Sequence, residues 1–153
     1  MFYYYTDGSC KSNGNPNSAG GWGIVKVDEF DNILWEQQGT KAPTTNNEME
    51  LIAILTALKY IKEKEETDCI IYSDSAYCVN LINSWMYNWK DNGWKRPKNQ
   101  EVKNLEIIKE IYDLAHLAEI RKTFGHSGIF GNEYADALAT GKISLSTLKK
   151  EWN

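Results

Sequence analysis

The sequence predicts an α/β fold in which a mixed sheet is flanked by helices. Two observations support this prediction. Three strand-like segments follow one another at the start of the chain, separated by turns rich in Gly, Asn and Asp. Beyond them, short apolar runs alternate with segments of helical periodicity, as in parallel strands joined by helices. We find no internal repeat or linker, and therefore expect one domain over residues 1–153, with its core at about 2–143 and a short tail at 144–153.

The expected strands are apolar or aromatic runs bounded by turn residues. They cover residues 2–10, 22–27, 33–38, 69–73 and 120–124.

Four further segments have the spacing of helices. The first opens at a capping box, Thr45-Asn46-Asn47-Glu48, and extends at least to Ile61. Its apolar residues surround much of the helix, so we expect it to be largely buried. The other three cover residues 75–84, 105–117 and 132–143.

Composition limits the class of protein. With 153 residues, 42% of them hydrophobic, the chain has the usual size of one domain and can bury a core. It lacks an apolar stretch of about 18 residues, the length of a membrane span, and its first residues lack the Lys or Arg of a signal peptide. We expect a soluble, cytoplasmic monomer. Its three cysteines are an odd number without metal-type spacing, which predicts free, buried thiols.

Four acidic residues occupy positions where a carboxylate is hard to explain by structure alone: Asp7, Glu50, Asp74 and Asp136. Asp7 interrupts an aromatic strand, where Asp is disfavoured. Each of the others has a structural alternative: Glu50 as a first-turn helix acid, Asp74 as a helix cap, and Asp136 as a surface residue. If the four meet, their repulsion requires a cation, and hard oxygen ligands favour Mg²⁺ or Mn²⁺.

A basic segment runs from residue 90 to residue 103. The net charge of −4 argues against binding nucleic acid through overall charge, so such a role requires a local basic surface. This segment has five basic residues against Asp91 and Glu101; Trp94 lies among them, and Trp85 and Trp89 come just before. The basic residues are Lys90, Lys95, Arg96, Lys98 and Lys103.

Five short motifs, in order and at the right spacing, resemble those of the ribonuclease HI family over about residues 2–140. They are Thr6-Asp7-Gly8-Ser9-Cys10, Thr45-Asn46-Asn47 with Met49-Glu50-Leu51, Tyr72-Ser73-Asp74-Ser75, Gly125-His126-Ser127-Gly128 and Asn132-Glu133-Tyr134-Ala135-Asp136. The resemblance implies a five-stranded sheet in the order 3-2-1-4-5 with strand 2 antiparallel. It also implies cleavage of the RNA strand of RNA–DNA hybrids, leaving 5′-phosphate and 3′-hydroxyl ends.

The resemblance assigns roles to the acidic residues. By position, Asp7 would bridge two Mg²⁺ ions, Asp136 would complete the site of the ion that activates the attacking water, and Glu50 and Asp74 would hold the other ion. Mn²⁺ is expected to substitute. His126 resembles the family's histidine that assists proton transfer or product departure, although a lone His is more often a surface residue.

The resemblance also implies contacts with the hybrid. The basic and aromatic segment would form a protrusion against the DNA strand, with its tryptophans on the deoxyribose face; the alternative is that at least one tryptophan is a core residue. Thr45 and Asn104 would hold a DNA phosphate, while other polar residues would meet the hybrid, including its 2′-hydroxyls. The protrusion residues are Trp85, Trp89, Lys90, Trp94, Lys95, Arg96 and Lys98, and the remaining polar candidates are Asn15, Asn46, Asn47 and Asn132.

Three positions depart from the family pattern. Pro43 and Glu48 stand where relatives often have basic residues, and Ala76 replaces a common polar contact. We therefore expect a lower affinity for the hybrid, or the use of Lys41 in place of the missing basic residue. Two other functions remain open on this sequence: a catalytically silent nucleic-acid-binding module and a DNA-directed or integrase-like nuclease of the same fold.

Overall fold

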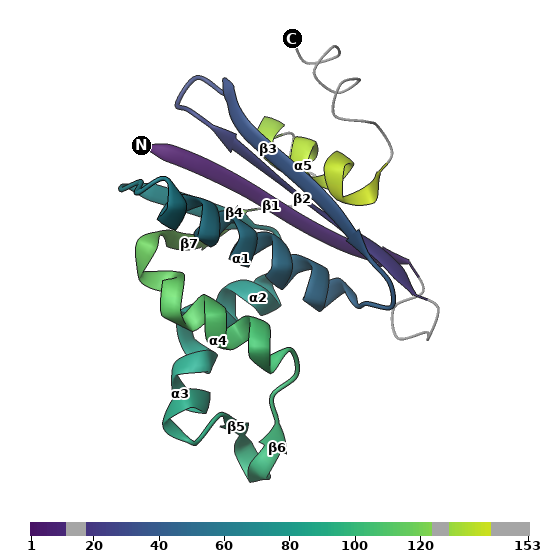
Figure 1. Cartoon of the computed structure of the whole chain (residues 1–153), viewed down its shortest axis with the longest axis vertical. Coiled ribbons are helices and arrows are strands. Elements are labelled where there is room, and N and C mark those ends of the chain that lie inside the picture. The colour runs from purple at the N-terminus through teal and green to yellow at the C-terminus, as the bar shows by residue number, and fades with distance from the viewer. Residues whose placement is uncertain (12–17, 124–128, 142–153) are drawn as a thin grey trace.

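The structure is a computed structural model that describes residues 1–11, 18–123 and 129–141. Its centre is a five-stranded sheet in the order β3-β2-β1-β4-β7 (Figure 1). β1 pairs with β2 antiparallel and with β4 parallel, β2 pairs with β3 antiparallel, and β4 pairs with β7 parallel. The expected topology is therefore confirmed. The strands are β1 (Phe2–Lys11), β2 (Ala19–Val27), β3 (Ile33–Lys41), β4 (Cys69–Ser73) and β7 (Glu119–Lys122).

Helices cover both faces of the sheet. α1, α2 and α4 lie on one side and α5 on the other, where α5 packs against β1, β2 and β3 (Figure 1). The helices are α1 (Asn46–Glu63), α2 (Ala76–Asn80), α3 (Met86–Asp91), α4 (Leu105–Leu114) and α5 (Phe130–Thr140), with a π-helical turn η1 (Leu81–Trp85) and two 3₁₀ turns, η2 (Pro97–Asn99) and η3 (Ala115–Leu117).

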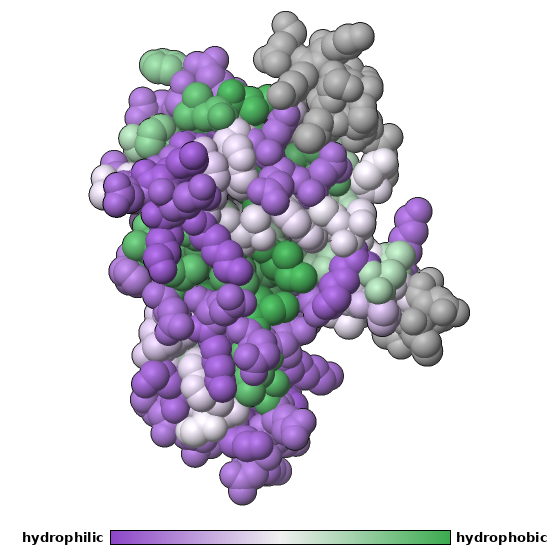
Figure 2. Space-filling model, viewed as in Figure 1, coloured by the Kyte–Doolittle hydropathy of each residue, from purple (hydrophilic) through white to green (hydrophobic). Residues whose placement is uncertain are grey.

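The helix expected at residues 75–84 is longer than predicted. It continues through the π-helical turn into α3 and ends at Asp91. A short hairpin, β5 (Lys95–Arg96) with β6 (Gln100–Glu101), follows and was not predicted, since strands of two residues show no periodicity. The segment from α3 to β6 extends away from the sheet (Figure 1), and Figure 2 shows mainly hydrophilic residues over it.

The start of α1 has half of the expected capping box. Thr45 is the N-cap, and its hydroxyl oxygen accepts the Glu48 backbone N–H at 3.1 Å. The Glu48 carboxylate makes contacts outside the helix instead: it accepts from the Thr44 hydroxyl at 2.6 Å and from Lys41 Nζ at 2.7 Å. The first turn of α1 is thus attached to the end of β3.

The core divides into two clusters, one on each face of the sheet. The larger cluster lies on the α1 side, where α1 buries residues around most of its circumference. The smaller one joins Val25 and Val27 of β2 to Tyr134 and Leu138 of α5. As expected, the cysteines in the described residues are free thiols; Cys69 and Cys78 are buried as predicted, whereas Cys10, near the end of β1, is only half-buried. Within the described ranges, no helix is long and apolar enough to cross a membrane.

Candidate active site

Asp7 lies in β1, at the centre of the sheet, and is only 4% exposed. Its Oδ1 accepts the Gly8 backbone N–H at 2.9 Å. Gly8 allows β1 and α1 to lie in close contact, because a Cβ at this position would lie 2.3 Å from the Glu50 backbone nitrogen and 2.4 Å from the Met49 carbonyl carbon. Only glycine lets β1 approach α1 this closely, and the approach brings Asp7 beside Glu50.

Glu50 faces inward from α1 and is 7% exposed, as the helical spacing predicted. It lies four residues after Asn46, beyond the first turn, and the acid of that turn is Glu48. The alternative reading of Glu50 as a first-turn acid is therefore wrong. Its Oε2 is buried and has no hydrogen-bond partner among the residues that the structure describes. A buried, unpartnered carboxylate oxygen is costly and suggests a missing ligand.

Asp74 follows the last residue of β4 and is half-buried. The cap of α2 is its neighbour Ser75, whose hydroxyl oxygen accepts the Cys78 N–H at 3.1 Å. The alternative reading of Asp74 as a helix cap is therefore wrong, which leaves its carboxylate free for the site.

These carboxylates meet. One oxygen from each of Asp7, Glu50 and Asp74 lies within 4.8 Å of the others. Asp136, half-buried on α5, is not one of these three, but it lies near enough to Asp7 to raise the Asp7 pKa. The structure thus brings three of the predicted carboxylates together, from β1, α1 and the end of β4, with Asp136 of α5 near Asp7.

Burial and mutual repulsion disfavour the charged forms of this cluster. Burial raises the pKa of Asp7, and the Glu50 charge, the Asp136 contact and the Asp74 charge raise it further. Burial also raises the pKa of Glu50, helped by the Asp74 charge and opposed by hydrogen bonds with Asp7, Gly8 and Ser73. Without a cation, the cluster is electrostatically unfavourable at neutral pH.

The donor set fits a hard divalent cation. Carboxylate oxygens are the ligands that Mg²⁺ and Mn²⁺ prefer, and no other described residue is a hydrogen-bond partner of Glu50 Oε2. Two oxygens on one Mg²⁺ lie at most about 4.2 Å apart, twice the usual metal–oxygen distance. The three carboxylates therefore need only small side-chain movements to share one ion.

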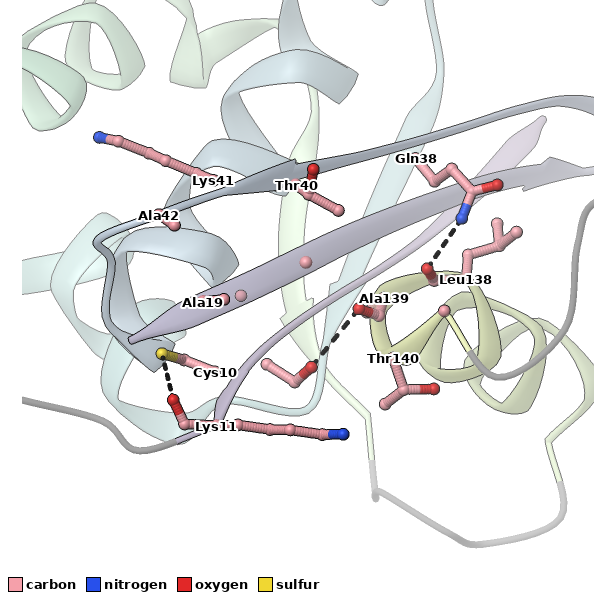
Figure 3. Close-up of a pocket in the computed structure, with 14 residues that line it drawn as sticks. Cys10, Lys11, Ala19, Gln38, Thr40, Lys41, Ala42, Leu138, Ala139 and Thr140 are labelled. Atoms are coloured by element: carbon pink, nitrogen blue, oxygen red, sulfur yellow. Dashed lines mark hydrogen bonds between the residues drawn. The ribbon is translucent and has the colours of Figure 1, made fainter. Parts of the chain in front are cut away.

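Side chains of β1 and β3 hold the end of the helix that carries Asp136. Gln38 Nε2 donates to the Leu138 carbonyl oxygen at 3.1 Å, and the Ser9 hydroxyl to that of Ala139 at 3.5 Å (Figure 3). The last carbonyls of a helix lack partners inside it, so these bonds satisfy them and fix α5 on the sheet. They border a hollow of about 640 Å³ whose lining includes none of the four carboxylates.

The three tryptophans of the predicted protrusion are half-buried and pack against the larger core cluster. Trp85 meets Trp89 with ring centroids 6.4 Å apart, and Trp94 meets Tyr112 edge-on at 5.6 Å. All three therefore contribute to packing while part of each ring stays accessible, so neither the core role nor the predicted contact with the hybrid is decided for any of them.

The basic residues of the protrusion differ in how free they are. Lys95 and Lys98 are exposed, and Lys90 is exposed with its Nζ 5.4 Å from the centre of the Tyr112 ring. Arg96 is half-buried, and its Nε donates to the Glu101 carbonyl oxygen at 2.8 Å. Three lysines therefore present charge to solvent, while Arg96 also holds the β5–β6 hairpin.

The other predicted substrate contacts lie at element ends. Thr45 and Asn47 are at the start of α1, beside Asn46, whose Oδ1 accepts the Cys10 backbone N–H at 2.6 Å. Asn104 precedes α4 in a left-handed conformation, with φ of 58°. Asn132 lies one turn before Asp136 on α5 and is 3% exposed. Asn15 and His126 fall outside the described residues.

Sequence reasoning gave no separate role to Ser73 or to the Lys41–Glu48 pair. Ser73 is fully buried beside Glu50, and the only sequence signal was a hydroxyl at the end of an apolar strand before an Asp. Lys41, one of the two ways in which the missing basic residue could be offset, forms an ion pair with Glu48, with 2.7 Å between Nζ and Oε2.

The fold and the site together define a class. It is an α/β protein with a mixed sheet and a carboxylate cluster suited to metal, which lies on the central strand β1 and just after the carboxyl end of its parallel neighbour β4. Comparison with known proteins makes the class specific. Residues 2–144 match the RNase H family, and the chain belongs to that family.

Named relatives agree with this membership. The chain is 44% identical to the ribonuclease H of Acetivibrio thermocellus, covering 95% of this chain and 96% of that one. It is 43% identical to the ribonuclease H of Francisella philomiragia subsp. philomiragia, covering 95% and 92%. The expectation of an enzyme of the ribonuclease H type is confirmed.

Solved structures share the fold. LC9-RNase H1, a type 1 RNase H with the type 2 active-site motif, has a TM-score of 0.78 at 29% identity and covers 92% of this chain and 70% of that one. The foamy viral protease-reverse transcriptase in complex with RNA/DNA hybrid has a TM-score of 0.80 at 26% identity, covering 92% of this chain and 19% of that one.

Proposed function

We propose that this protein is an endonuclease that hydrolyses the RNA strand of RNA–DNA hybrids with divalent metal, giving 5′-phosphate and 3′-hydroxyl ends. The observation that carries the proposal is the meeting of Asp7, Glu50 and Asp74, with one carboxylate oxygen of each within 4.8 Å of the others. Family membership and a similar structure solved with an RNA/DNA hybrid support the choice of substrate.

The four carboxylates would hold the metal, with Mg²⁺ as the proposed ion and Mn²⁺ as its substitute. Divalent ions in such a site lower the pKa of the attacking water and stabilise the leaving oxygen. The protein's own part is to position the carboxylates. β1 and the end of β4 would hold those of Asp7 and Asp74, while α1 and α5 would bring those of Glu50 and Asp136 from opposite faces of the sheet. We propose two ions, with Asp7 shared between them.

The hybrid would lie across the starts of α1 and α4 and the protrusion. Exposed Lys90, Lys95 and Lys98 offer charge to DNA phosphates, and the half-buried tryptophans offer a flat, firmly packed surface for sugars. Thr45 and Asn104 are proposed phosphate contacts, with Asn15, Asn46, Asn47 and Asn132 nearer the RNA. His126 is proposed to assist proton transfer or product departure. A monomeric state, a single domain and a cytoplasmic location remain predictions.

A substrate panel tests the proposal. Labelled RNA–DNA hybrid, RNA duplex, DNA duplex and single strands are incubated with Mg²⁺ or with EDTA. We expect cleavage of the hybrid's RNA alone, only with metal, and with 5′-phosphate ends. Cutting of the DNA duplex would support a DNA-directed nuclease. Binding of the hybrid without cleavage under any metal condition would support a silent binding module.

A further inference from the structure

Among the four proposed metal ligands, Asp136 alone lies close to the end of a helix. It is half-buried on α5, four residues before the helix ends at Thr140. Asp7, by contrast, lies within a central strand, and Glu50 lies within a helix of 18 residues. Helix ends fray, because the last four carbonyl groups have no partner inside the helix. The position of Asp136 therefore depends on what holds this end of α5.

A glycine of β2 lets α5 lie directly on the sheet beside Asp7. A Cβ at Gly23 would lie 2.5 Å from Leu138 Cβ and 2.7 Å from the Ala135 carbonyl oxygen. Gly23 is also paired with Asp7 in the register of β1 and β2. The residue before Asp136 thus rests on the cross-strand neighbour of Asp7. A shift of α5 at this point would move Asp136 away from Asp7.

The sheet holds the last turn of α5 through two side chains (Figure 3). Gln38 Nε2 donates to the Leu138 carbonyl oxygen at 3.1 Å, within the usual range of such bonds. The Ser9 hydroxyl lies 3.5 Å from the Ala139 carbonyl oxygen, which is long for a hydroxyl donor. Without Gln38, the Leu138 oxygen would keep the Gly141 N–H, at 3.4 Å. The Gln38 amide is therefore the firmer of the two ties between this turn and the sheet.

We propose that Gln38 is a positioning residue, which holds the last turn of α5 on the sheet and so keeps Asp136 beside Asp7 for metal binding. Gln38 lies on β3, an edge strand that carries none of the four carboxylates. The inference rests on the metal site of the proposed function, but not on the identity of the nucleic-acid substrate.

Calorimetric titration of the full chain with Mn²⁺, in the absence of nucleic acid, tests the inference. Gln38→Met removes the amide donor at similar length and without a change of charge. It should weaken Mn²⁺ binding by about three- to tenfold, the fold-change that corresponds to one net hydrogen bond. Gln37→Met is the matched control. Gln37 is also exposed, but it points to the opposite face of β3, so this variant should bind Mn²⁺ as the wild type does.

Two charged variants separate the hydrogen bond from simple electrostatics. Gln38→Lys keeps a donor that can reach the last carbonyls of a helix, so its Mn²⁺ affinity should stay within about twofold of the wild type. Gln38→Glu has the same shape but cannot donate, so it should weaken Mn²⁺ binding as Gln38→Met does. Attraction or repulsion of the cation by the new charge predicts the reverse order.

A double-mutant cycle separates positioning from general stability. In an Asp136→Ala background, Gln38→Met should cause no further loss of Mn²⁺ affinity, because the ligand that Gln38 positions is gone. Hydrogen exchange in EDTA reports on the helix end itself. The amides of residues 137–141 should exchange about three- to tenfold faster in Gln38→Met, and at wild-type rates in Gln37→Met.

Three results would overturn the inference. They are wild-type Mn²⁺ affinity in Gln38→Met, binding by Gln38→Lys as weak as by Gln38→Met, and an equal loss from Gln38→Met with and without Asp136. Circular dichroism establishes that the variants are folded, as expected for changes at an exposed side chain. If the wild type binds Mn²⁺ but cleaves no hybrid, the proposed function fails, while the calorimetric comparison still decides the role of Gln38.

Discussion

Asp7 and Glu50 are the residues on which the site depends most, and the surroundings of both disfavour the charged carboxylate. Their burial, 4% and 7% exposed, raises the pKa of each, and their neighbours are also acids. An acid with a raised pKa favours folding at low pH and loses that contribution as the pH rises from its ordinary value, about 4, toward the raised one. The metal-free site should therefore destabilise the protein at neutral pH.

Asp7→Asn should make the metal-free protein more stable. The amide keeps an acceptor for the Gly8 N–H but carries no charge, so we expect a gain of about 1–3 kcal/mol in unfolding free energy at pH 7.5 in EDTA. The gain should shrink toward zero near pH 4, where the wild-type carboxyl is protonated as well. Urea unfolding at both pH values measures it. A variant less stable than the wild type at pH 7.5, or a gain that persists at pH 4, would contradict the electrostatic explanation.

Gly8→Ala should damage both folding and metal binding. The new Cβ would overlap the backbone of Met49 and Glu50, so β1 and α1 must separate at the point where Asp7 and Glu50 meet. We expect a loss of about 1–3 kcal/mol in unfolding free energy, as for other overpacked sites, together with weaker Mn²⁺ binding. Urea unfolding and calorimetry check this. Wild-type values for both would show that the close approach is unimportant.

The four carboxylates could be selected from the sequence because Asp7 stands in an aromatic strand and the others in motifs of fixed spacing. Sequence alone could not reject the structural alternative for Asp74, since this depends on where α2 begins; the predicted cap of α1 at Thr45, by contrast, already places Glu50 beyond the first turn. The contact of Gln38 with α5 could not be predicted either, because it depends on how α5 packs across β3.

At the scale of elements, β2 is tied to the turn after α1 by a buried ion pair. Lys26 Nζ pairs with Glu66, and both side chains are less than a tenth exposed. Tyr4 of β1 donates its hydroxyl to the other oxygen of Glu66, and Lys26 Nζ lies 4.1 Å from the centre of the Phe2 ring. Burial raises the pKa of Tyr4, so its hydroxyl stays protonated and remains a donor.

Lys26→Ala should destabilise the protein by about 3–5 kcal/mol, because it leaves the Glu66 charge buried without its cation. Lys59→Ala is the matched control: its pair with Glu110 is 3.3 Å long but more than half exposed, and its loss should cost less than about 1 kcal/mol. Chemical denaturation measures the loss of unfolding free energy in the two variants. Equal losses would show that burial of the Lys26 pair is unimportant.

Elements with strong periodicity were predictable, and those set by tertiary contacts were not. β4 lies at the expected residues, and α1 begins at its predicted cap. The continuation through η1 to Asp91 was missed because tryptophans and basic residues interrupt the apolar spacing. α5 begins two residues earlier than expected, at Phe130, whose ring packs edge-on against Tyr134 at 5.7 Å.

Across the whole molecule, basic and acidic residues are unevenly distributed. The net charge is −4, yet the segment from α3 to β6, which extends from the body (Figure 1), has three exposed lysines, Lys90, Lys95 and Lys98. At the start of α1, by contrast, the cation of Lys41 is neutralised by Glu48. Nucleic-acid affinity depends on the number of free cations that meet phosphates, so this pair should weaken hybrid binding.

Glu48→Gln should tighten hybrid binding by about three- to tenfold in EDTA at low salt, because it frees Lys41 for a phosphate while the amide can still accept from Thr44. The salt dependence should steepen by about one unit of slope, as for one added phosphate contact. Glu110→Gln changes the net charge equally and frees Lys59 at the other end of α1, so it controls for overall charge. Fluorescence anisotropy over a salt series measures both, and equal gains in the two variants would refute a local effect.

The most direct measurement is anomalous diffraction from crystals of this protein soaked in Mn²⁺. The carboxylate cluster predicts a manganese peak bound by oxygens of Asp7, Glu50 and Asp74, and its loss in Asp7→Asn crystals soaked in the same way. Manganese bound elsewhere, with none among these three carboxylates, would contradict the metal site from which the proposed chemistry follows.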